Sequence, residues 1–169
     1  RLRCAVVSEG GSTKTVYYFW AGDLVGETHI FEAPPPLPLL VTSVGPSVVK
    51  SLGHVEARRL AVMNSSLAEE LLASMASKTL GAIDQVRQLR FMSVEERVAA
   101  FLEKMLSRVG NEAARELALT HEEIADFVGA HRVSVTEALK RMELTGAIET
   151  RRGRIAVKRL DLLQRAVVS

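Results

Sequence analysis

Cysteine is nearly absent from this sequence, because Cys4 is the only one in 169 residues. A single thiol cannot form an internal disulfide, and it cannot supply the several ligands of a cysteine-rich zinc or iron–sulfur site. Long apolar runs are absent as well. None approaches the roughly 18 residues that a membrane-spanning helix needs, so the sequence predicts no membrane segment. Hydrophobic residues still make up 47% of the chain, which is enough for a core.

The start of the sequence has neither an initiator methionine nor an apolar leader. Arg1-Leu2-Arg3-Cys4 runs directly into a segment of alternating polarity, which is not the pattern of a signal peptide. We therefore expect a cytoplasmic protein. Because the first residues have the pattern of a strand interior, we also expect further strands upstream of Arg1.

Charge is unevenly distributed, although the net charge is only +2. Basic residues outnumber acidic ones between His131 and Arg159, and the rest of the chain is mildly acidic. A solvated charged face would have the same composition. The asymmetry nevertheless favours a polyanionic partner at the C-terminal end.

The first 60 residues have the composition of strands separated by turns. Glu9-Gly10-Gly11-Ser12 favours a hairpin turn, and Pro34-Pro35-Pro36 is a stiff loop that cannot donate to a sheet. Short segments rich in β-branched and aromatic residues lie around these turns. We expect strands at residues 3–7, 15–20, 41–44 and 48–52, and such short strands predict an antiparallel β-barrel or jelly roll.

From about Val55 the spacing of apolar residues becomes helical. A short helix is predicted from Val55 to Val62, and a helix of about 25 residues follows, with Ser66 and Glu69 as its capping box. Its apolar stripe is Leu67, Leu71, Leu72, Met75, Thr79, Ile83, Val86 and Leu89. A helix of this length exceeds a small core, so we expect it to pack on a second copy of itself. A single core helix is the alternative.

A helix-turn-helix is predicted between Thr120 and Leu144. Ser93 with Glu96, and Thr120 with Glu123, form two further capping boxes, which indicate helix starts. Gly129 suits the positive φ of a tight turn, and the small Ala125 allows two helices to cross closely. Ile124, Val128, Val135, Ala138 and Leu139 fall on the shared inner faces. Another kind of helical hairpin would reproduce part of this pattern.

A two-stranded wing with a basic tip is predicted after the second helix. Residues 147–150 and 154–157 are its strands, and Arg151-Arg152-Gly153 is its tip. Arginines there suit phosphate contacts, which add affinity without reading sequence. The second helix would enter the major groove of DNA.

The outward face of the second helix carries the candidate base contacts. Arg132 suits phosphate or guanine, Val133 a thymine methyl group, and Thr136 either kind of base. Glu137 either accepts from cytosine N4, orients an arginine, or forms a surface ion pair with Arg141. The predicted DNA-binding set is Thr120, Arg132, Val133, Ser134, Thr136, Glu137, Lys140, Arg141, Arg151 and Arg152.

The order of these parts resembles the Crp/Fnr superfamily of regulators. Residues 17–27, Tyr-Tyr-Phe-Trp-Ala-Gly-Asp-Leu-Val-Gly-Glu, resemble that family's strand, turn and Gly-Asp-x-x-Gly-Glu motif, and residues 119–129 and 132–136 resemble its DNA-reading helices. The resemblance implies an α+β fold in three parts. These are a partial effector-sensing β-barrel at residues 1–62, a dimerisation helix at 63–92, and a winged helix-turn-helix at 93–169.

The resemblance also implies a function. It predicts a transcriptional regulator rather than an enzyme, which binds a pseudo-palindromic operator in double-stranded DNA as a homodimer and contacts RNA polymerase. The predicted dimer interface is Leu72, Met75, Thr79, Ile83 and Val86. Many family members carry Glu and Arg where this chain has Val133 and Glu137, so the family's familiar operator is not implied.

The sensor part departs from the members that bind cyclic AMP. Those members hold the phosphate with an Arg-Ser pair where this chain has Leu37-Pro38, and they present Thr-Ser where an ungapped match places Ala82-Ile83. Burying an anionic phosphate without such partners is costly. We therefore expect a small apolar or aromatic effector rather than cyclic AMP. The expected effector pocket is Gly26, Glu27, Leu37, Leu39, Ala82 and Ile83.

Other interpretations remain open at this stage. His29 or His54 could ligate a haem iron, and an iron–sulfur cluster would need ligands upstream of Arg1. These histidines with Glu27 and Glu32 are too few and too oddly spaced for a catalytic metal, so we expect no metal site. A winged helix can also bind a protein without specific DNA binding, but the basic wing argues against that use.

Overall fold

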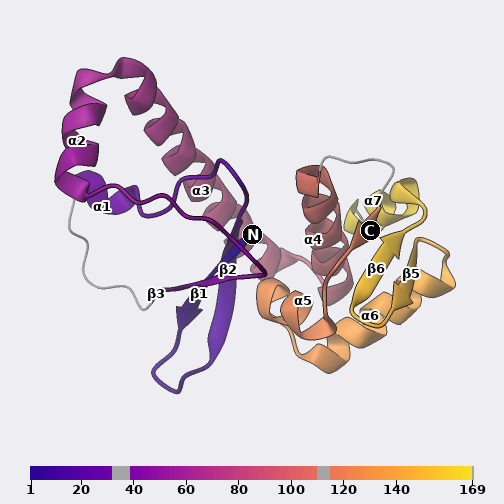
Figure 1. Cartoon of the computed structure of the whole chain (residues 1–169). Coiled ribbons are helices and arrows are strands. Elements are labelled where there is room, and N and C mark those ends of the chain that lie inside the picture. The colour runs from indigo at the N-terminus through magenta and orange to yellow at the C-terminus, as the bar shows by residue number, and fades with distance from the viewer. Residues whose placement is uncertain (32–38, 110–114, 169) are drawn as a thin grey trace. The chain divides into compact units, whose positions relative to one another are not determined.

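The computed structural model describes residues 1–31, 39–109 and 115–168, which form two compact units. The first unit spans Arg1–Gln85 and the second Val86–Ser169. Helix α3 (Ser65–Phe91) runs from the first unit into the second (Figure 1). Within the described residues, no helix is long and apolar enough to cross a membrane.

The first unit contains a three-stranded antiparallel sheet in the order β2-β1-β3. The strands are β1 (Leu2–Val7), β2 (Thr13–Phe19) and β3 (Leu39–Ser43). The predicted hairpin turn joins β1 to β2, with Gly11 at φ 79°. This sheet is the described part of the predicted partial barrel, and these residues do not close a barrel by themselves.

Two local predictions for the first unit are wrong. Residues 48–52 form no strand: the chain turns at Gly45, whose φ is 87°, and the side chain of Val48 is 95% exposed. The capping box of Ser66 and Glu69 is not used either. The cap lies two residues earlier, at Asn64, whose Oδ1 accepts from the backbone N–H of Leu67 at 3.1 Å, and α3 begins at Ser65. Asparagine caps a helix as well as serine does, so the start moves without loss.

Two other helices belong to the first unit. Helix α1 (Thr28–Phe31) is a single turn that follows the Gly-Glu motif, and it was not predicted. Helix α2 (His54–Met63) agrees with the short helix expected from Val55 to Val62.

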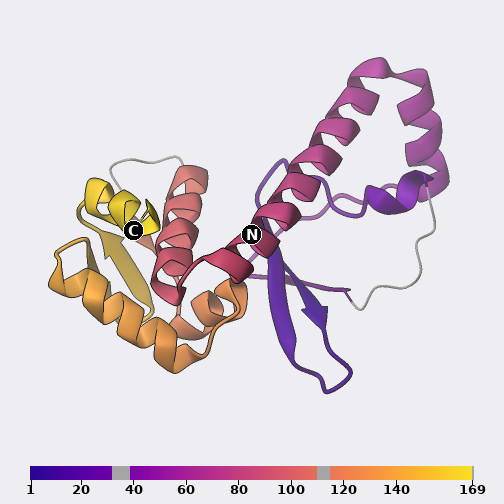
Figure 2. The same ribbon diagram turned by 180° about the vertical axis from the view of Figure 1, so that it is seen from behind.

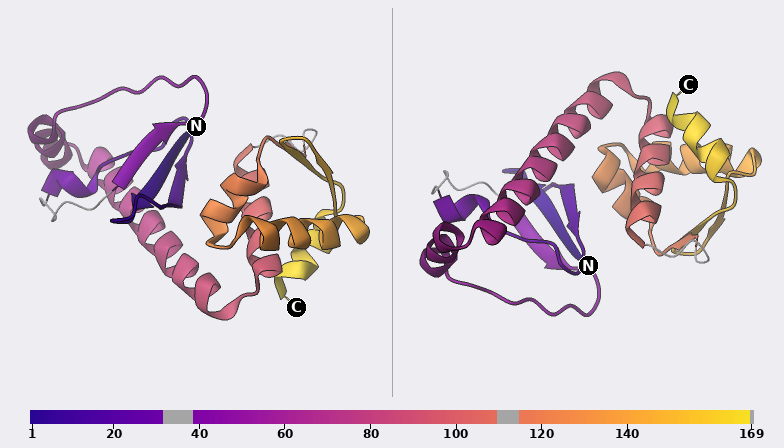
Figure 3. Two further views of the ribbon diagram at one scale, coloured as in Figure 1. Left: turned by 90° about the horizontal axis from the view of Figure 1, so that it is seen from below. Right: turned by 90° about the horizontal axis from the view of Figure 1, so that it is seen from above.

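The second unit packs four helices around a small antiparallel sheet. The sheet has the order β4-β6-β5. Figure 3 shows the helices around it from two directions. The elements are α4 (Val94–Val109), β4 (Glu116–Leu117), α5 (His121–Val128), α6 (Arg132–Leu144), β5 (Ile148–Arg151), β6 (Arg154–Val157) and α7 (Leu160–Val168).

The core of the second unit forms where α4 meets α5, α6 and α7. The rings of Phe101 and Phe127 stack with their centroids 4.4 Å apart, which joins α4 to α5. All five inner residues predicted for the helix-turn-helix are buried: Ile124, Val128, Val135, Ala138 and Leu139. The periodicity argument is therefore confirmed for both helices.

Both predicted capping boxes of the second unit are present. Ser93 and Glu96 exchange hydrogen bonds at the start of α4, and Thr120 and Glu123 do so at the start of α5. The turn after α5 uses Gly129 at φ 66°, a left-handed conformation in which its N–H donates to Ala125 O. Residues with a Cβ rarely adopt this conformation, which explains the glycine.

A buried ion pair holds α3 against the rest of the first unit, and the views agree that this helix passes beside the sheet (Figures 2 and 3). The side chain of Glu27 is only 3% exposed. Its carboxylate accepts from Lys78 Nζ and, at 2.7 Å, from Ser74 Oγ, both on α3. Lys78 also donates to Leu24 O at 2.7 Å, and Gln85 Nε2 donates to Val16 O at 2.6 Å.

The Glu27 carboxylate is ionised and satisfied within the chain. Burial alone would raise the pKa of Glu27, but the hydrogen bonds from Lys78 and Ser74 outweigh that effect and lower it. Removing only one partner of such a pair leaves a buried charge uncompensated, which is strongly destabilising.

Lys78→Met is accordingly expected to lower the free energy of unfolding of the first unit by about 3–5 kcal/mol, because Glu27 loses its cation. Urea unfolding followed by the fluorescence of Trp20, the only tryptophan, measures this loss. The double variant Glu27→Gln/Lys78→Met should recover most of it. Lys50→Met, at an exposed lysine of the same unit, is the matched control. Equal effects of Lys78→Met and Lys50→Met would contradict the role of the pair.

Candidate nucleic-acid interface

Helix α4 fixes the position of the helix-turn-helix. Arg97 Nη1 on α4 donates to Val128 O at 2.7 Å and to Gly129 O at 3.3 Å, where α5 ends. A cation there also complements the negative end of the helix dipole. Arg141 of α6 forms an ion pair with Glu95 of α4. The turn and the second helix are thus both tied to α4 by polar contacts, in addition to the apolar core.

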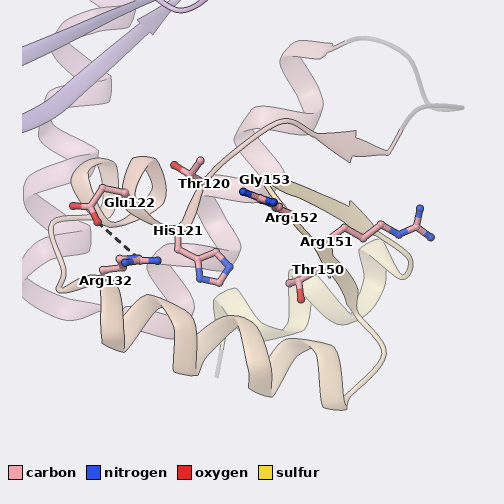
Figure 4. Close-up of a pocket in the computed structure, with 8 residues that line it drawn as sticks. All are labelled: Thr120, His121, Glu122, Arg132, Thr150, Arg151, Arg152 and Gly153. Atoms are coloured by element: carbon pink, nitrogen blue, oxygen red, sulfur yellow. Dashed lines mark ion pairs between the residues drawn. The ribbon is translucent and has the colours of Figure 1, made fainter.

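A polar cleft opens between the start of the helix-turn-helix and the wing. It has a volume of about 530 Å³, and its lining residues come from the start of α5, from α6 and from the β5–β6 hairpin, where the side chain of Arg151 points outward (Figure 4). The lining comprises Thr120, His121, Glu122, Arg132, Thr150, Arg151, Arg152 and Gly153. Three arginines and one acidic residue give the lining a net positive charge, and the predicted residues Thr120, Arg132, Arg151 and Arg152 all belong to it.

The ion pairs of the cleft are weak enough to exchange for phosphate. Arg132 Nε lies 3.9 Å from Glu122 Oε2, and both side chains are exposed (dashed line in Figure 4). Arg151 is held by Glu149 next to the tip. Exposed pairs contribute about 0–1 kcal/mol, so an arriving phosphate can replace them at little cost. Arg152 forms no ion pair with any described residue and is exposed.

The outward face of α6 presents a mixed surface. The side chain of Val133 is 69% exposed. Glu137 and Lys140 are exposed, while Ser134 and Thr136 are half-buried. Arg141 forms an ion pair with Glu95 of α4, and among the described residues none joins Glu137 to Arg141.

The base of the wing is attached to the end of α6. The backbone N–H and the hydroxyl of Thr150 both donate to Glu143 Oε1, at 2.7 and 2.9 Å. Glu149 Oε2 accepts from Lys158 at 2.7 Å across the β5–β6 hairpin. The wing is therefore held in a defined orientation relative to the second helix.

Sequence reasoning missed three residues of this interface: Arg97, Glu143 and His121. Nothing in the sequence pattern marked Arg97 or Glu143, because their partners are backbone groups and a wing residue brought close only by the fold. His121 follows the N-cap directly and could have been recognised as facing the cleft. Its Nδ1 lies 2.9 Å from Thr136 Oγ1.

The residues of the expected effector pocket differ in their exposure to solvent. Glu27 is buried and bonded to α3, whereas Gly26, Leu39, Ala82 and Ile83 are exposed. Leu37 lies outside the described residues. His29 and His54 are both exposed, and within the described residues no group of three potential ligands could hold a metal ion.

The residues expected at the dimer interface form an exposed stripe on α3. Leu72, Ile83 and Val86 are each between 60% and 68% exposed. Thr79 is exposed and Met75 is half-buried. Leu80 and Leu89 add to the uncovered apolar surface of the same helix.

The sequence of this chain is similar to those of known transcriptional regulators. The family model of the Crp-like helix-turn-helix domain matches residues 96–166. A CRP-like cAMP-activated global transcriptional regulator from Mycobacterium tuberculosis is 31% identical over 121 residues, which are 69% of this chain and 54% of the relative. The cAMP-activated global transcriptional regulator CRP from Pasteurella multocida is 26% identical over 141 residues, 82% of this chain and 68% of the relative.

Solved structures show the same fold. A CRP-family transcriptional regulator from Thermus thermophilus superposes with a TM-score of 0.77 at 21% identity, over 99% of this chain and 84% of that one. The regulator CprK, solved in complex with OCPA, gives a TM-score of 0.73 at 18% identity, over 97% and 75%. From its helix-turn-helix, its wing and these likenesses, the chain belongs to the Crp/Fnr superfamily of DNA-binding transcriptional regulators.

Proposed function

We propose that this regulator acts as a homodimer on a pseudo-palindromic operator and that a small effector other than cyclic AMP controls it. The DNA-binding part of the proposal rests on the cleft next to α6, whose lining includes Arg132, Arg151 and Arg152. Phosphate contacts at the cleft fix the register on the duplex, and α6 then places Val133 and Glu137 at base edges. A role in protein binding alone is not favoured.

The exposed stripe of α3 supports the dimer. A helix of 27 residues is about 40 Å long, and a run of exposed apolar side chains along it favours a partner with the same period. A second copy supplies that partner by symmetry. Two α6 helices about 34 Å apart would then meet successive major grooves of one face of DNA.

The chemistry of the first unit supports an effector other than cyclic AMP. Two relatives are named as cAMP-activated, but this chain has Leu37-Pro38 where cyclic-AMP-binding members have Arg-Ser. The Glu27 carboxylate is turned toward α3, where its Oε1 accepts from Lys78 and Ser74. Ala82 and Ile83 carry no hydroxyl group. A small apolar or aromatic molecule suits these residues better than a nucleotide.

The path from effector to DNA runs through the link between α3 and α4. Only Met92 and Ser93 separate the two helices. Helix α4 holds α5 through Arg97 and α6 through Glu95, so a change in the packing of α3 would move the helix-turn-helix as one body. An effector does this only if it binds one arrangement more tightly than the other. RNA polymerase in the cytoplasm is the further partner of such a regulator.

Selection of bound sequences from random duplex DNA tests this function. The full chain is incubated with the library alone, with cyclic AMP, or with a bacterial metabolite extract. We expect a pseudo-palindrome with half-sites one helical turn apart, stronger or weaker enrichment with the extract, and no change with cyclic AMP. No enrichment under any condition would refute specific DNA binding, and a response to cyclic AMP alone would refute the effector assignment.

Arg152→Ala is expected to weaken binding to every duplex by a similar factor and to reduce the salt slope of log K by about one per subunit, because the residue contacts phosphate and not a base. Fluorescence anisotropy over a range of salt concentrations measures both effects. Arg165→Ala, which removes the same charge from the exposed face of α7, should leave the slope unchanged. A loss confined to one operator sequence would instead make Arg152 a base contact.

Ile83→Glu is expected to convert the dimer to a monomer, because it places a charge in the middle of the apolar stripe. Sedimentation velocity measures the oligomeric state, and affinity for the palindrome should fall much more than affinity for a single half-site. Ser77→Glu, on the opposite face of α3, is the matched control and should remain dimeric. A dimeric Ile83→Glu variant would remove α3 from the proposed interface.

A further inference from the structure

His121 bridges the two helices of the helix-turn-helix. It is the first residue of α5, half-buried, and its Nδ1 lies 2.9 Å from Thr136 Oγ1 on α6. The Thr136 hydroxyl donates its proton to Arg132 O at 2.9 Å. A hydroxyl has only one proton to give, so it must act as the acceptor toward His121. The His121 ring therefore carries a proton on Nδ1.

This hydrogen bond determines what each partner can offer to DNA. Thr136 has no proton left for a base and can only accept a hydrogen bond. The ring nitrogen that His121 has left for a ligand is Nε2. In the neutral ring Nε2 is an acceptor, which repels a phosphate oxygen, and in the protonated ring it is a donor that bonds one.

Charged side chains line the cleft together with His121. Arg132 of α6 and Arg152 of the wing line the cleft with it, whereas the side chain of Arg151 points away from it (Figure 4). The two acidic residues in the first turn of α5 are both engaged: Glu122 pairs with Arg132, and Glu123 accepts from the N–H and hydroxyl of Thr120. A phosphodiester in the cleft would neutralise the arginines and supply an acceptor for Nε2.

We propose that His121 takes up a proton when DNA binds and donates it from Nε2 to a backbone phosphate, which couples operator affinity to pH. The proposal rests on the proposed DNA-binding function and assigns a regulation to the same cleft. Histidine is the side chain whose charge ordinarily changes between about pH 5 and 8, so the coupling falls in that range. Uptake of one proton per subunit strengthens binding up to tenfold per subunit for each unit that the pH falls.

Anisotropy titrations of the full chain with its selected operator, at constant salt from about pH 5.5 to 8.5, test the coupling. The wild type is expected to bind more weakly as the pH rises, with a limiting slope of two protons per dimer. His121→Gln should bind at every pH with little slope. His121→Arg, a permanent cation, should bind tightly without a slope. His54→Gln, at an exposed histidine of the first unit, should keep the slope of the wild type.

The outcomes separate the two claims. Sequence-specific binding by the wild type with no pH dependence, or a slope that persists in His121→Gln, overturns the role of His121 and leaves the DNA-binding function standing. If the pH slope disappears in His131→Gln instead, the proton is taken up by His131, the N-cap of α6, and the role of His121 is also overturned. Absence of operator binding at every pH overturns the proposed function and this inference together.

Discussion

The apolar face of α4 is the contact on which the DNA-binding unit depends. Val98, Leu102 and Met105 are buried there, and Phe101 stacks on Phe127 of α5. The same helix contacts α6 and α7, so it is the common support of elements that would not form a core alone. Two polar residues of α4 also hold the helix-turn-helix. Arg97 binds the carbonyls at the end of α5, and Glu95 pairs with Arg141 of α6. The angle between α5 and α6 is maintained because α4 contacts both helices.

The contrast between buried and exposed charges separates the structural part of the molecule from the part that meets DNA. Glu27 and Lys78 form a buried pair, whose charges cannot be separated without a large penalty. The pairs around the cleft are exposed and individually weak, so a phosphate can replace their acidic members. His121 lines the same cleft, and it is the residue through which we propose that pH affects DNA binding.

The sequence predicted the second unit better than the first. For the candidate site it predicted the helices and the wing, but not the hydrogen bonds that hold them together. Capping boxes, the turn glycine and the helical periodicity of residues 120–144 are local signals, which survive folding. The strand expected at 48–52 failed because β-branched residues favour a strand only where a neighbouring strand can pair with them. The bonds of Arg97, Glu143 and His121 join side chains to groups 7 to 32 residues away, so no local pattern contains them.

The central claim is that α6 and the wing of each subunit bind the same duplex together. Hydroxyl-radical footprinting of the selected operator by the full chain tests it most directly, because cleavage of each sugar reports local contact with the backbone. Two protected patches, symmetric about the operator centre and one helical turn apart, with flanking protection that is lost in Arg152→Ala, would agree with the account. A single protected patch, or flanking protection that Arg152→Ala leaves intact, would contradict it.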